Sequence, residues 1–591
     1  MRGSQRQTLV QYCPKGEPSP VNRRSFVALS LSAFPPVAGI AWAQRFGIER
    51  PLLGTPRRDE IVVIGGGLGG CAAACAAAQS GRRVVLAVEG DWLGGQLTAQ
   101  AAPPDEHPWI ETHGSTASYR ALREAIRKHY RDQESLNGRA RAMAELNPGN
   151  CWVSRLGVEP RIAASVLEQL LAPWVRHGTL RILRRVQLIG VDTDHDRIWA
   201  VVLRSLDTGK QIELQGEYFL DATDLGELVH LSGAEWVTGA ESAQATDELH
   251  APSKANPQSQ QAFTWAMGLE YRPGKDFRGS PPKEYNYWRN FVPDTHPVWG
   301  GPLLSWDGPN PATLKPRRLG FNPVGTTTEP NLWTYRRVRD ASLFQPGAKG
   351  RDVCIVNWPQ NDYFAGALIG DNAEEVVKHR ESGRQLSSCL LHWLQTEAPR
   401  PDGGVGWPGL RLCPAVMGTS DGVAHVPYIR ESRRICAEFT LGEKHLGVEQ
   451  RGSRGLGIDG ERGAEPFSDS IGIGAYRIDL HPTSTGDNYL DISSYPFQIP
   501  MGTLIPIRLE NLLPAAKNIG TTHISNGCAR VHPVEWNIGE SAGHLAAYCL
   551  DRHSPPRFIR TNLREREGFQ ARLVEAGIEL AWPKANRGVA L

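Results

Sequence analysis

Three glycines carry the clearest chemical signal in the sequence. Gly65, Gly67 and Gly70 have the G-x-G-x-x-G spacing, and Glu89 lies 19 residues beyond Gly70. Glycines with this spacing allow a tight turn, let the backbone approach a pyrophosphate, and let a helix pack closely on a strand. An acid placed like Glu89 accepts hydrogen bonds from ribose hydroxyls and repels a 2′-phosphate. The spacing therefore predicts a dinucleotide site.

Four further segments favour FAD over NAD. Residues 94–96 supply the glycine pair that passes along the pyrophosphate and ribitol in many FAD proteins, and residues 218–224 resemble the second flavoprotein fingerprint, with Asp224 in place of its glycine. Residues 511–520 resemble the closing FAD strand, and residues 535–543 predict the start of a helix whose dipole would stabilise reduced flavin. The cofactor residues predicted from these segments are Gly94, Gly95, Gln96, Ala222, Thr223, Asn518, Gly520, Asn537 and Gly539.

These segments together resemble the FAD-dependent oxidoreductase family whose members carry GGQLT after the first Rossmann unit. The resemblance runs across nearly the whole chain beyond the leader and rests on residues 94–98, 103–109, 356–362, 428–434 and 532–537. It implies FAD as the cofactor and a FAD domain like that of glutathione reductase, but hardly a substrate. No second G-x-G-x-x-G unit with its strand and helix opens a nicotinamide domain.

Two histidines are candidates for the base that takes a proton while flavin removes a hydride. His523 is the first candidate and His532 the second, because both fall between the predicted closing strand and its helix, beside the flavin. A structural role as a hydrogen-bond anchor is the alternative for each. Arg430, the third predicted catalytic residue, is expected either to fix an anionic or polyhydroxylated substrate or to lie on a solvated helix face.

Arg477, Asp479 and His481 alternate with apolar residues. On a strand, alternate side chains share one face. This pattern predicts that the three side chains line the substrate cleft together.

The elements that position these residues predict an α/β fold. Residues 59–64 and 83–88 indicate buried parallel strands, and the Ala-rich residues 71–79 indicate the helix between them. A helix is expected over 161–175, followed by a small antiparallel excursion from 181 to 203. The predicted architecture is a discontinuous Rossmann-type FAD-binding domain with an inserted mixed α+β substrate domain.

The predicted domain limits follow the fingerprint segments. In order they are a signal peptide (1–43), the first part of the FAD-binding domain (55–240), a substrate or cap domain (241–484), the closing part of the FAD-binding domain (485–552) and a C-terminal helical tail (553–591). The tail contains one amphipathic helix, expected near 564–576.

The leader has the features of a twin-arginine export signal. Arg23 and Arg24 precede an apolar run over 27–41, and Ala41-Trp42-Ala43 offers a small-x-small cleavage site. The run is shorter than the roughly 20 apolar residues of a stable membrane span. We therefore expect bacterial export to the periplasm or beyond, with retention as an N-terminal anchor as the alternative.

The amino-acid composition indicates which classes of partner and ligand are not expected. Sixty-five basic and sixty-three acidic side chains give a net charge of +2, which gives no reason to expect nucleic acid as a partner. The ten cysteines form no CxxC pair and no HExxH is present, so no metal site is expected.

The function expected from these features is that of an extracytoplasmic FAD-dependent dehydrogenase or oxidase of a small organic substrate, with sugars or other hydroxyl compounds favoured. Electrons would pass to oxygen, a quinone or a redox protein. One alternative is a lyase or isomerase that uses FAD without net redox change, and another is a flavin-binding protein without catalysis. The substrate, the acceptor, the attachment of FAD and the oligomeric state are left open.

Overall fold

A five-stranded parallel sheet forms the centre of the molecule. The computed structural model describes residues 59–348, 350–370, 372–454 and 462–591, so the predicted signal peptide lies outside the described residues. The strand order is β22-β7-β1-β2-β3, and Ile61 of β1 lies between Val84 of β2 and Tyr218 of β7. The strands are β1 (Ile61–Ile64), β2 (Val84–Val88), β3 (Leu180–Arg184), β7 (Tyr218–Asp221) and β22 (Leu512–Pro514).

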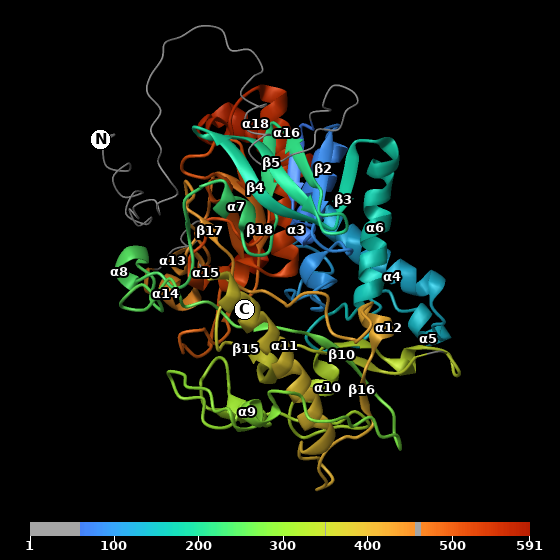
Figure 1. The fold of residues 1–591 in the computed structure, drawn as a ribbon. Coiled ribbons are helices and arrows are strands. Elements are labelled where there is room, and N and C mark those ends of the chain that lie inside the picture. Colours follow the sequence, from blue (N-terminus) through green and yellow to red (C-terminus); the bar gives the residue numbers. More distant parts are fainter. Residues whose placement is uncertain (1–58, 349, 371, 455–461) are drawn as a thin grey trace.

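Both faces of this sheet are covered, which explains its continuous apolar runs. Ile61 and Val63 pack with the helices α3 (Leu68–Gln79) and α16 (His532–Arg552). Val62 and Ile64, on the opposite face, pack with an antiparallel meander. The meander consists of β4 (Val186–Asp194), β5 (Arg197–Ser205) and β6 (Gln211–Gln215), and lies in front of the sheet in Figure 1.

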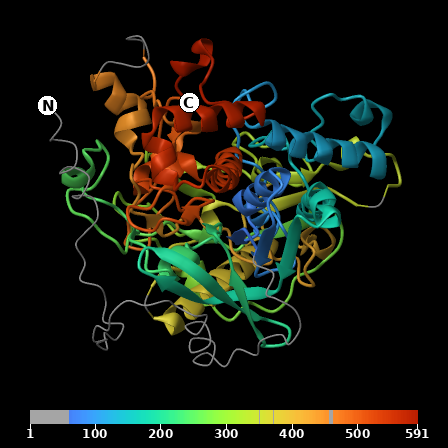
Figure 2. The ribbon, with the colours of Figure 1, turned by 90° about the horizontal axis from the view of Figure 1, so that it is seen from above.

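Helices α3 and α16 approach each other unusually closely because small residues line their contact. A Cβ on Gly539 would overlap the carbonyl oxygen of Gly69, and a Cβ on Gly543 would overlap that of Ala73. Viewed from above, the red C-terminal helices lie beside the blue helix α3 (Figure 2). The C-terminal part of the chain therefore completes the unit that the first residues begin.

A second, antiparallel sheet organises the other half of the molecule. Its order is β13-β14-β10-β16, and the long helix α11 (Ala373–Thr396) packs against it; these elements lie in the lower part of Figure 1. The strands are β10 (Met267–Tyr271), β13 (Arg337–Arg339), β14 (Val353–Val356) and β16 (Leu410–Leu412). Its core is rich in tryptophan, with Trp265, Trp288, Trp299, Trp306, Trp333, Trp358, Trp393 and Trp407 all buried.

Short strand pairs and helices fill the space around the two sheets. The pairs are β8 (Trp236–Val237) with β17 (Arg434–Ile435), β9 (Phe263–Thr264) with β15 (Asp362–Tyr363), β11 (Asp307–Pro309) with β12 (Pro316–Arg318), β18 (Ser470–Gly474) with β21 (Phe497–Pro500), and β19 (Ile478–Leu480) with β20 (Leu490–Ile492). The remaining α-helices are α4 (Ala117–Gln133), α5 (Gly138–Arg141), α6 (Pro160–His177), α7 (Glu227–Leu231), α8 (Ala243–Thr246), α9 (Tyr285–Asn290), α10 (Leu332–Tyr335), α12 (Pro414–Met417), α13 (Glu443–Leu446), α14 (Val448–Arg454), α15 (His523–Ala529), α17 (Pro556–Thr561), α18 (Leu563–Glu575) and α19 (Lys584–Arg587).

The predicted elements are present. Strands β1 and β2 and helix α3 surround the glycines, α6 covers the helix expected over 161–175, and α18 matches the helix expected near 564–576. The antiparallel excursion expected over 181–203 is the meander β4–β6, but its predicted start was wrong, because residues 181–183 belong to the parallel strand β3. The α/β fold with an inserted second unit is confirmed. The predicted domain limits stay a prediction. In the described part of the chain, no helix is both long and apolar enough to span a membrane.

Candidate cofactor and substrate site

The loop between β1 and α3 has the geometry that its glycines predict. Gly65 has φ +106°, and a Cβ there would overlap the carbonyl oxygen of Ala222. A Cβ on Gly70 would overlap the carbonyl oxygen of Gly65, where the helix packs on the strand. Gly67 is the N-cap of α3, and its nearest neighbour is Glu535 Oε1, at 3.1 Å from an added Cβ. Gly65 and Gly70 are thus required by the close packing around them. Gly67 instead leaves the backbone of the loop uncovered by a side chain.

A second glycine pair lies directly beside this loop. Gly94 and Gly95 both have positive φ, +103° and +46°, which favours glycine. The Gly94 amide donates to the Gly66 carbonyl at 2.7 Å, and a Cβ on Gly95 would lie 2.9 Å from the Cα of Gly67. The two loops form a cradle with bare backbone on both sides, at the N-terminus of a helix whose amides favour a phosphate.

Glu89 and Thr223 lie beyond the carboxyl ends of β2 and β7, the two strands that flank β1. Glu89 follows β2, is exposed, and accepts from Gln187 Nε2 at 3.4 Å. The Ala222 amide donates to the Ile64 carbonyl at 2.7 Å, which ties β7 to β1. Thr223 Oγ1 donates to Asp221 Oδ1 at 2.6 Å.

Four predicted cofactor residues are engaged in protein contacts. Asn518 Nδ2 donates to the Asp221 carbonyl at 3.1 Å, and Asn537 Nδ2 donates to the Ile471 carbonyl at 3.3 Å. Gly520 packs against Ala437 and Phe439, and Gly539 packs against Gly69. All four positions are buried, and the contacts seen here fix the elements around the cradle.

Charged residues that the fingerprint does not specify border the cradle. Glu535, in the first turn of α16, accepts from the Gly69 amide at 3.2 Å and from Gln96 Nε2 at 2.5 Å. Burial raises the pKa of Glu535, and the Lys517 ammonium opposes this shift. Lys517 itself pairs with Asp224 at 2.8 Å. The acid that replaces the fingerprint glycine is therefore the partner of a buried lysine.

A cavity of about 680 Å³ has none of the cradle glycines in its lining. Its wall is rich in arginine, aspartate and aromatic residues. The lining residues include Glu106, His107, Trp152, Arg317, Tyr335, Arg336, Asn357, Trp358, Arg430, Tyr476, Arg477, Asp479, His481, Tyr489, Asp491 and Leu591. Arg477, Asp479 and His481 all belong to this wall, so the predicted sharing of one face by these three side chains is confirmed.

A short path of contacts joins the cradle to the cavity. Gln96 Nε2 donates to the Arg530 carbonyl at 3.2 Å, two residues before His532. His532 Nδ1 accepts from the Asp105 amide at 3.1 Å, and the Asp105 carboxylate lies 3.3 Å from the Arg336 guanidinium in the cavity wall. These contacts link the cradle to the cavity wall through protein atoms.

His532 has no free nitrogen. Since its Nδ1 accepts from Asp105, its Nε2 must carry the proton and donate to the Ala102 carbonyl at 3.1 Å. Burial lowers the pKa of His532 to about 4, against the opposing charge of Asp105. In this arrangement the neutral imidazole positions the 102–105 segment, and it has no lone pair available for proton abstraction.

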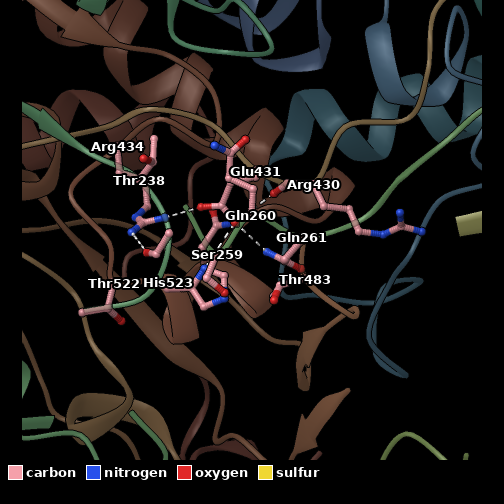
Figure 3. A network of polar contacts seen from close by, with 12 residues as sticks. Thr238, Ser259, Gln260, Gln261, Arg430, Glu431, Arg434, Thr483, Thr522 and His523 are labelled. Carbon is pink, nitrogen blue, oxygen red and sulfur yellow. Dashed lines mark hydrogen bonds and ion pairs between the residues drawn. The ribbon is translucent and has the colours of Figure 1, made fainter. Parts of the chain in front are cut away.

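His523 belongs to a buried network of its own (Figure 3). His523 Nδ1 lies 3.2 Å from Glu431 Oε2, and Glu431 also contacts Arg434. Burial alone would raise the pKa of Glu431, but the charges of His523 and Arg434 outweigh it and lower the pKa to about 2. His523 is not among the residues that line the cavity. Its predicted role as a base stays a prediction.

Arg430 faces away from that network, as Figure 3 shows, and lines the cavity. Its guanidinium lies 3.2 Å from Asp362 Oδ1 and donates to Asn357 Oδ1 at 3.2 Å. His481 Nδ1 lies 2.6 Å from the other oxygen of Asp362, while His481 Nε2 is 3.6 Å from Asp479 Oδ2. Burial would raise the pKa of Asp362, but Arg430 and His481 outweigh it and hold the pKa below its usual value. An ionised aspartate thus orients a histidine in the cavity wall.

The comparison with protein families decides the identity of this arrangement. A family model described as FAD dependent oxidoreductase matches residues 60–573. The chain belongs to this family. FAD is therefore the cofactor of this FAD-dependent oxidoreductase, and no curated protein shows significant similarity to the chain.

Several solved structures resemble the enzyme weakly. A glycerol-3-phosphate dehydrogenase from Bacillus halodurans complexed with FAD is 13% identical over 36% of this chain and 40% of its own, with a TM-score of 0.22. A myxobacterial chondrochloren halogenase is 16% identical over 38% of this chain and 46% of its own, with a TM-score of 0.20. A Diels–Alderase of pyrroindomycin biosynthesis is 12% identical over 88% of this chain and 72% of its own, with a TM-score of 0.29. The chain thus spans less than half the length of the first two.

The cradle of this FAD-dependent oxidoreductase fits its cofactor. At Gly67 and Gly95 two stretches of backbone without side chains lie together at the N-terminus of α3, as the pyrophosphate of FAD requires. The sequence did not reveal the roles of Asp362 and Asn357. Both fall in the family segment 356–362, so a polar cluster inside a quoted motif was the signal available.

Proposed function

We propose that this enzyme removes a hydride from a small hydroxyl- or amine-bearing organic substrate bound in the 680 Å³ cavity, with His481 as the base. The observation that carries the proposal is the His481–Asp362 pair, which combines a 2.6 Å contact with a place in the cavity wall. A base held by a buried carboxylate is the arrangement that proton abstraction needs.

Bound FAD supplies the capacity to accept the hydride. Asp362 accepts from His481 Nδ1, which leaves Nε2 as the atom that takes the substrate proton. The resulting imidazolium would lie between the carboxylates of Asp362 and Asp479. Arg430 keeps Asp362 ionised and fixed. These residues hold the proton while the substrate is oxidised.

The aromatic part of the wall supports a sugar or another polyhydroxyl compound as the substrate. Trp152 is 52% exposed at the cavity, and its ring meets Tyr335 edge to face at 5.2 Å. Such surfaces stack on the apolar faces of sugar rings. These aromatic surfaces and the charged residues of the same cavity wall match a substrate that has both apolar faces and oxygen atoms.

The proposal includes export and an electron acceptor outside the cytoplasm. The support is the Arg23-Arg24 leader and the lack of a second G-x-G-x-x-G unit with its strand and helix in the sequence. We infer that oxygen, a quinone or a redox protein reoxidises the flavin. Fractionation of cells that produce the chain with both arginines changed to lysine tests the export, because the variant should then remain in the cytoplasm.

Anaerobic mixing of the FAD-loaded enzyme with a panel of sugars, alcohols and amines tests the reaction. Lasting loss of the visible flavin absorbance with one of them is the expected result. His481→Gln should slow that loss by about 10²- to 10⁴-fold, the usual contribution of a positioned base. His195→Gln is the matched control, because His195 also bonds an aspartate, Asp194 at 2.7 Å, but is 92% exposed at the surface.

Each other outcome has a clear meaning. Bleaching at the normal rate in His481→Gln, together with slow bleaching in His523→Ala, would move the base to His523. Bleaching that reverses without any acceptor would indicate a lyase or isomerase. A flavin that no compound of the panel reduces would indicate a flavin-binding protein without oxidase or dehydrogenase activity.

A further inference from the structure

Several polar atoms in the cavity wall have no hydrogen-bond partner within the described protein. They belong to side chains that are each more than nine-tenths buried. These atoms are Asn357 Nδ2, Trp358 Nε1, Arg336 Nε, Arg430 Nε and the Tyr489 hydroxyl. A buried polar atom without a partner is costly, so a cluster of them in one cavity indicates a bound group. All but the hydroxyl are pure donors, and the group they fit presents acceptor oxygens.

The acidic side chains in and beside the cavity wall are paired with arginines, but one arginine of the wall has no acidic partner among the described residues. Asp491 pairs with Arg477 at 2.5 Å, and Glu106 pairs with Arg123 at 2.5 Å. Asp105 and Asp362 are the partners of Arg336 and Arg430. Asp479, the third carboxylate of the lining, lies 3.7 Å from the Arg530 guanidinium. Each of these five lining or adjacent carboxylates is therefore matched by an arginine.

Arg317, on strand β12, is the exception. Among the described residues it has no ion-pair partner, and its Nε is buried without a hydrogen bond. Burial and the charges of Asp362 and Asp479 raise the pKa of the Tyr489 hydroxyl, while the charges of Arg430 and Arg317 act against this shift. Arg317, Arg430 and Tyr489 all line the same cavity.

We propose that the substrate of this cavity is an organic anion whose carboxylate or phosphate group binds at Arg317, beside Arg430 and Tyr489. The inference rests on the proposed function, since it names the substrate class of the same cavity. A neutral polyol would satisfy the donors, because its hydroxyls accept, but it would give the partly buried Arg317 guanidinium no ionic partner. An anionic group satisfies both requirements, and hydrogen bonds between charged partners are the stronger ones.

Equilibrium binding to the FAD-loaded enzyme tests the proposal. The probes are matched pairs of an anion and a neutral counterpart: D-gluconate with D-glucose, lactate with lactamide and succinate with succinamide, together with inorganic phosphate. Binding is followed by the shift of the visible flavin spectrum and by tryptophan fluorescence, because Trp152 and Trp358 line the cavity. We expect at least one anion to bind about tenfold or more tightly than its neutral counterpart.

Variants at neighbouring positions separate site binding from general charge. Arg317→Ala should weaken binding of the anion by about 10- to 100-fold and leave the neutral compound unchanged, the range expected for one charge-assisted contact. Arg317→Lys should retain part of the affinity, because it keeps the charge. Arg318→Ala is the control, since the adjacent Arg318 pairs with Asp307 at the surface and is 52% exposed. Retained FAD and an unchanged melting temperature show that each variant is folded.

Three results overturn the proposal: no anion of the panel binds more tightly than its neutral counterpart, Arg317→Ala binds the anion as the wild type does, or Arg318→Ala weakens the anion equally. The last result would indicate general surface charge. The two proposals also fail separately. A neutral compound that bleaches flavin equally in wild type and Arg317→Ala keeps the oxidoreductase reaction and removes the anion site. Anion binding that depends on Arg317, without bleaching by any substrate of the panel, keeps the anion site and removes the oxidoreductase reaction.

Discussion

The cofactor cradle and the cavity are built in opposite ways. The cradle consists mainly of backbone, brought together at Gly65, Gly67 and Gly95, where a side chain would overlap neighbouring atoms or fill the space between the loops. The cavity consists of side chains, and its lining residues extend from Glu106 to Leu591. A site built from backbone restricts which residue types can occupy its positions, because a side chain would not fit there. A site built from side chains requires only that the residues lie close together in space, wherever they fall in the sequence.

The two regions also differ in how their polar groups are satisfied. Near the cradle, Glu535 accepts from Gly69 and Gln96, and Lys517 pairs with Asp224. In the cavity, donors such as Asn357 Nδ2 have no hydrogen-bond partner among the described residues. The difference indicates that the cradle is stabilised by its own contacts, while the cavity wall is arranged for a ligand. Changes in the first region should therefore reduce stability, and many changes in the second should alter binding or rate.

The sharpest test of this contrast is Gly69→Ala. A Cβ at this position would overlap the carbonyl oxygen of Ala515, directly after β22, and would lie 3.2 Å from the Glu535 carbonyl oxygen of α16. We expect loss of more than about 5 kcal/mol of stability, enough to abolish FAD binding and folding. Urea unfolding and the FAD content of the purified protein measure the effect. Gly138→Ala is the control, because no atom lies within 4 Å of its added Cβ and its φ is not positive. A folded Gly69→Ala variant with normal FAD content would show that helix α3 can move away from Ala515.

The same contrast explains what the sequence could predict. The glycines, Glu89 and the strands on either side of them form a local pattern, so the unit β1–α3–β2 and its dinucleotide site followed from spacing alone. The alternation of Arg477, Asp479 and His481 also followed, because a strand places alternate residues on one face. In each case the geometry is fixed within a few residues.

The chemistry of the cavity did not follow, because its pairs join distant segments. His481 meets Asp362 across 119 positions of the chain, and Arg336 meets Asp105 across an even larger separation. His523 and His532 were better candidates by their place beside the predicted flavin strand, but the contacts of a histidine are set by its tertiary neighbours. Both nitrogens of His532 bond the 102–105 segment, which nothing near residue 532 could reveal.

In the cavity, the largest stability effect should come from Asp362→Asn. The change leaves the buried Arg430 without its counter-charge, because Asp362 lies 3.2 Å from that guanidinium and both side chains are almost fully buried. Breaking a buried pair on one side costs about 3–5 kcal/mol, and we expect about 4 kcal/mol in urea unfolding. Asp276→Asn, which breaks a surface pair with Arg278, should leave the midpoint unchanged. Equal stability of wild type and Asp362→Asn would mean that the cavity wall adds nothing to the fold.

A pH dependence should come from Glu431 in the His523 network. Its pKa is lowered from 4.5 to about 2, so the carboxylate stabilises the folded state fully above about pH 4.5, and this contribution is lost as the pH falls toward 2. The shift corresponds to about 3 kcal/mol. Urea unfolding at a series of pH values should show a steep loss for the wild type below pH 4.5, and a shallower one for Glu431→Gln. The exposed control Glu575→Gln should keep the wild-type slope. A wild-type slope in Glu431→Gln would assign the acid sensitivity to other groups.

The smallest effect is expected at Glu89, where the cofactor site does use a side chain. Glu89 is exposed after β2 and contacts Gln187, so its loss should not disturb the fold. If its carboxylate accepts from the FAD ribose, Glu89→Gln should weaken FAD binding about tenfold, or about 1.4 kcal/mol, because a neutral amide accepts more weakly. Equilibrium dialysis of FAD measures this, with the exposed Asp207→Asn as the control. Unchanged affinity would remove the ribose contact, whereas loss as severe as that of Gly69→Ala would mean that side chains govern the cradle as much as backbone does.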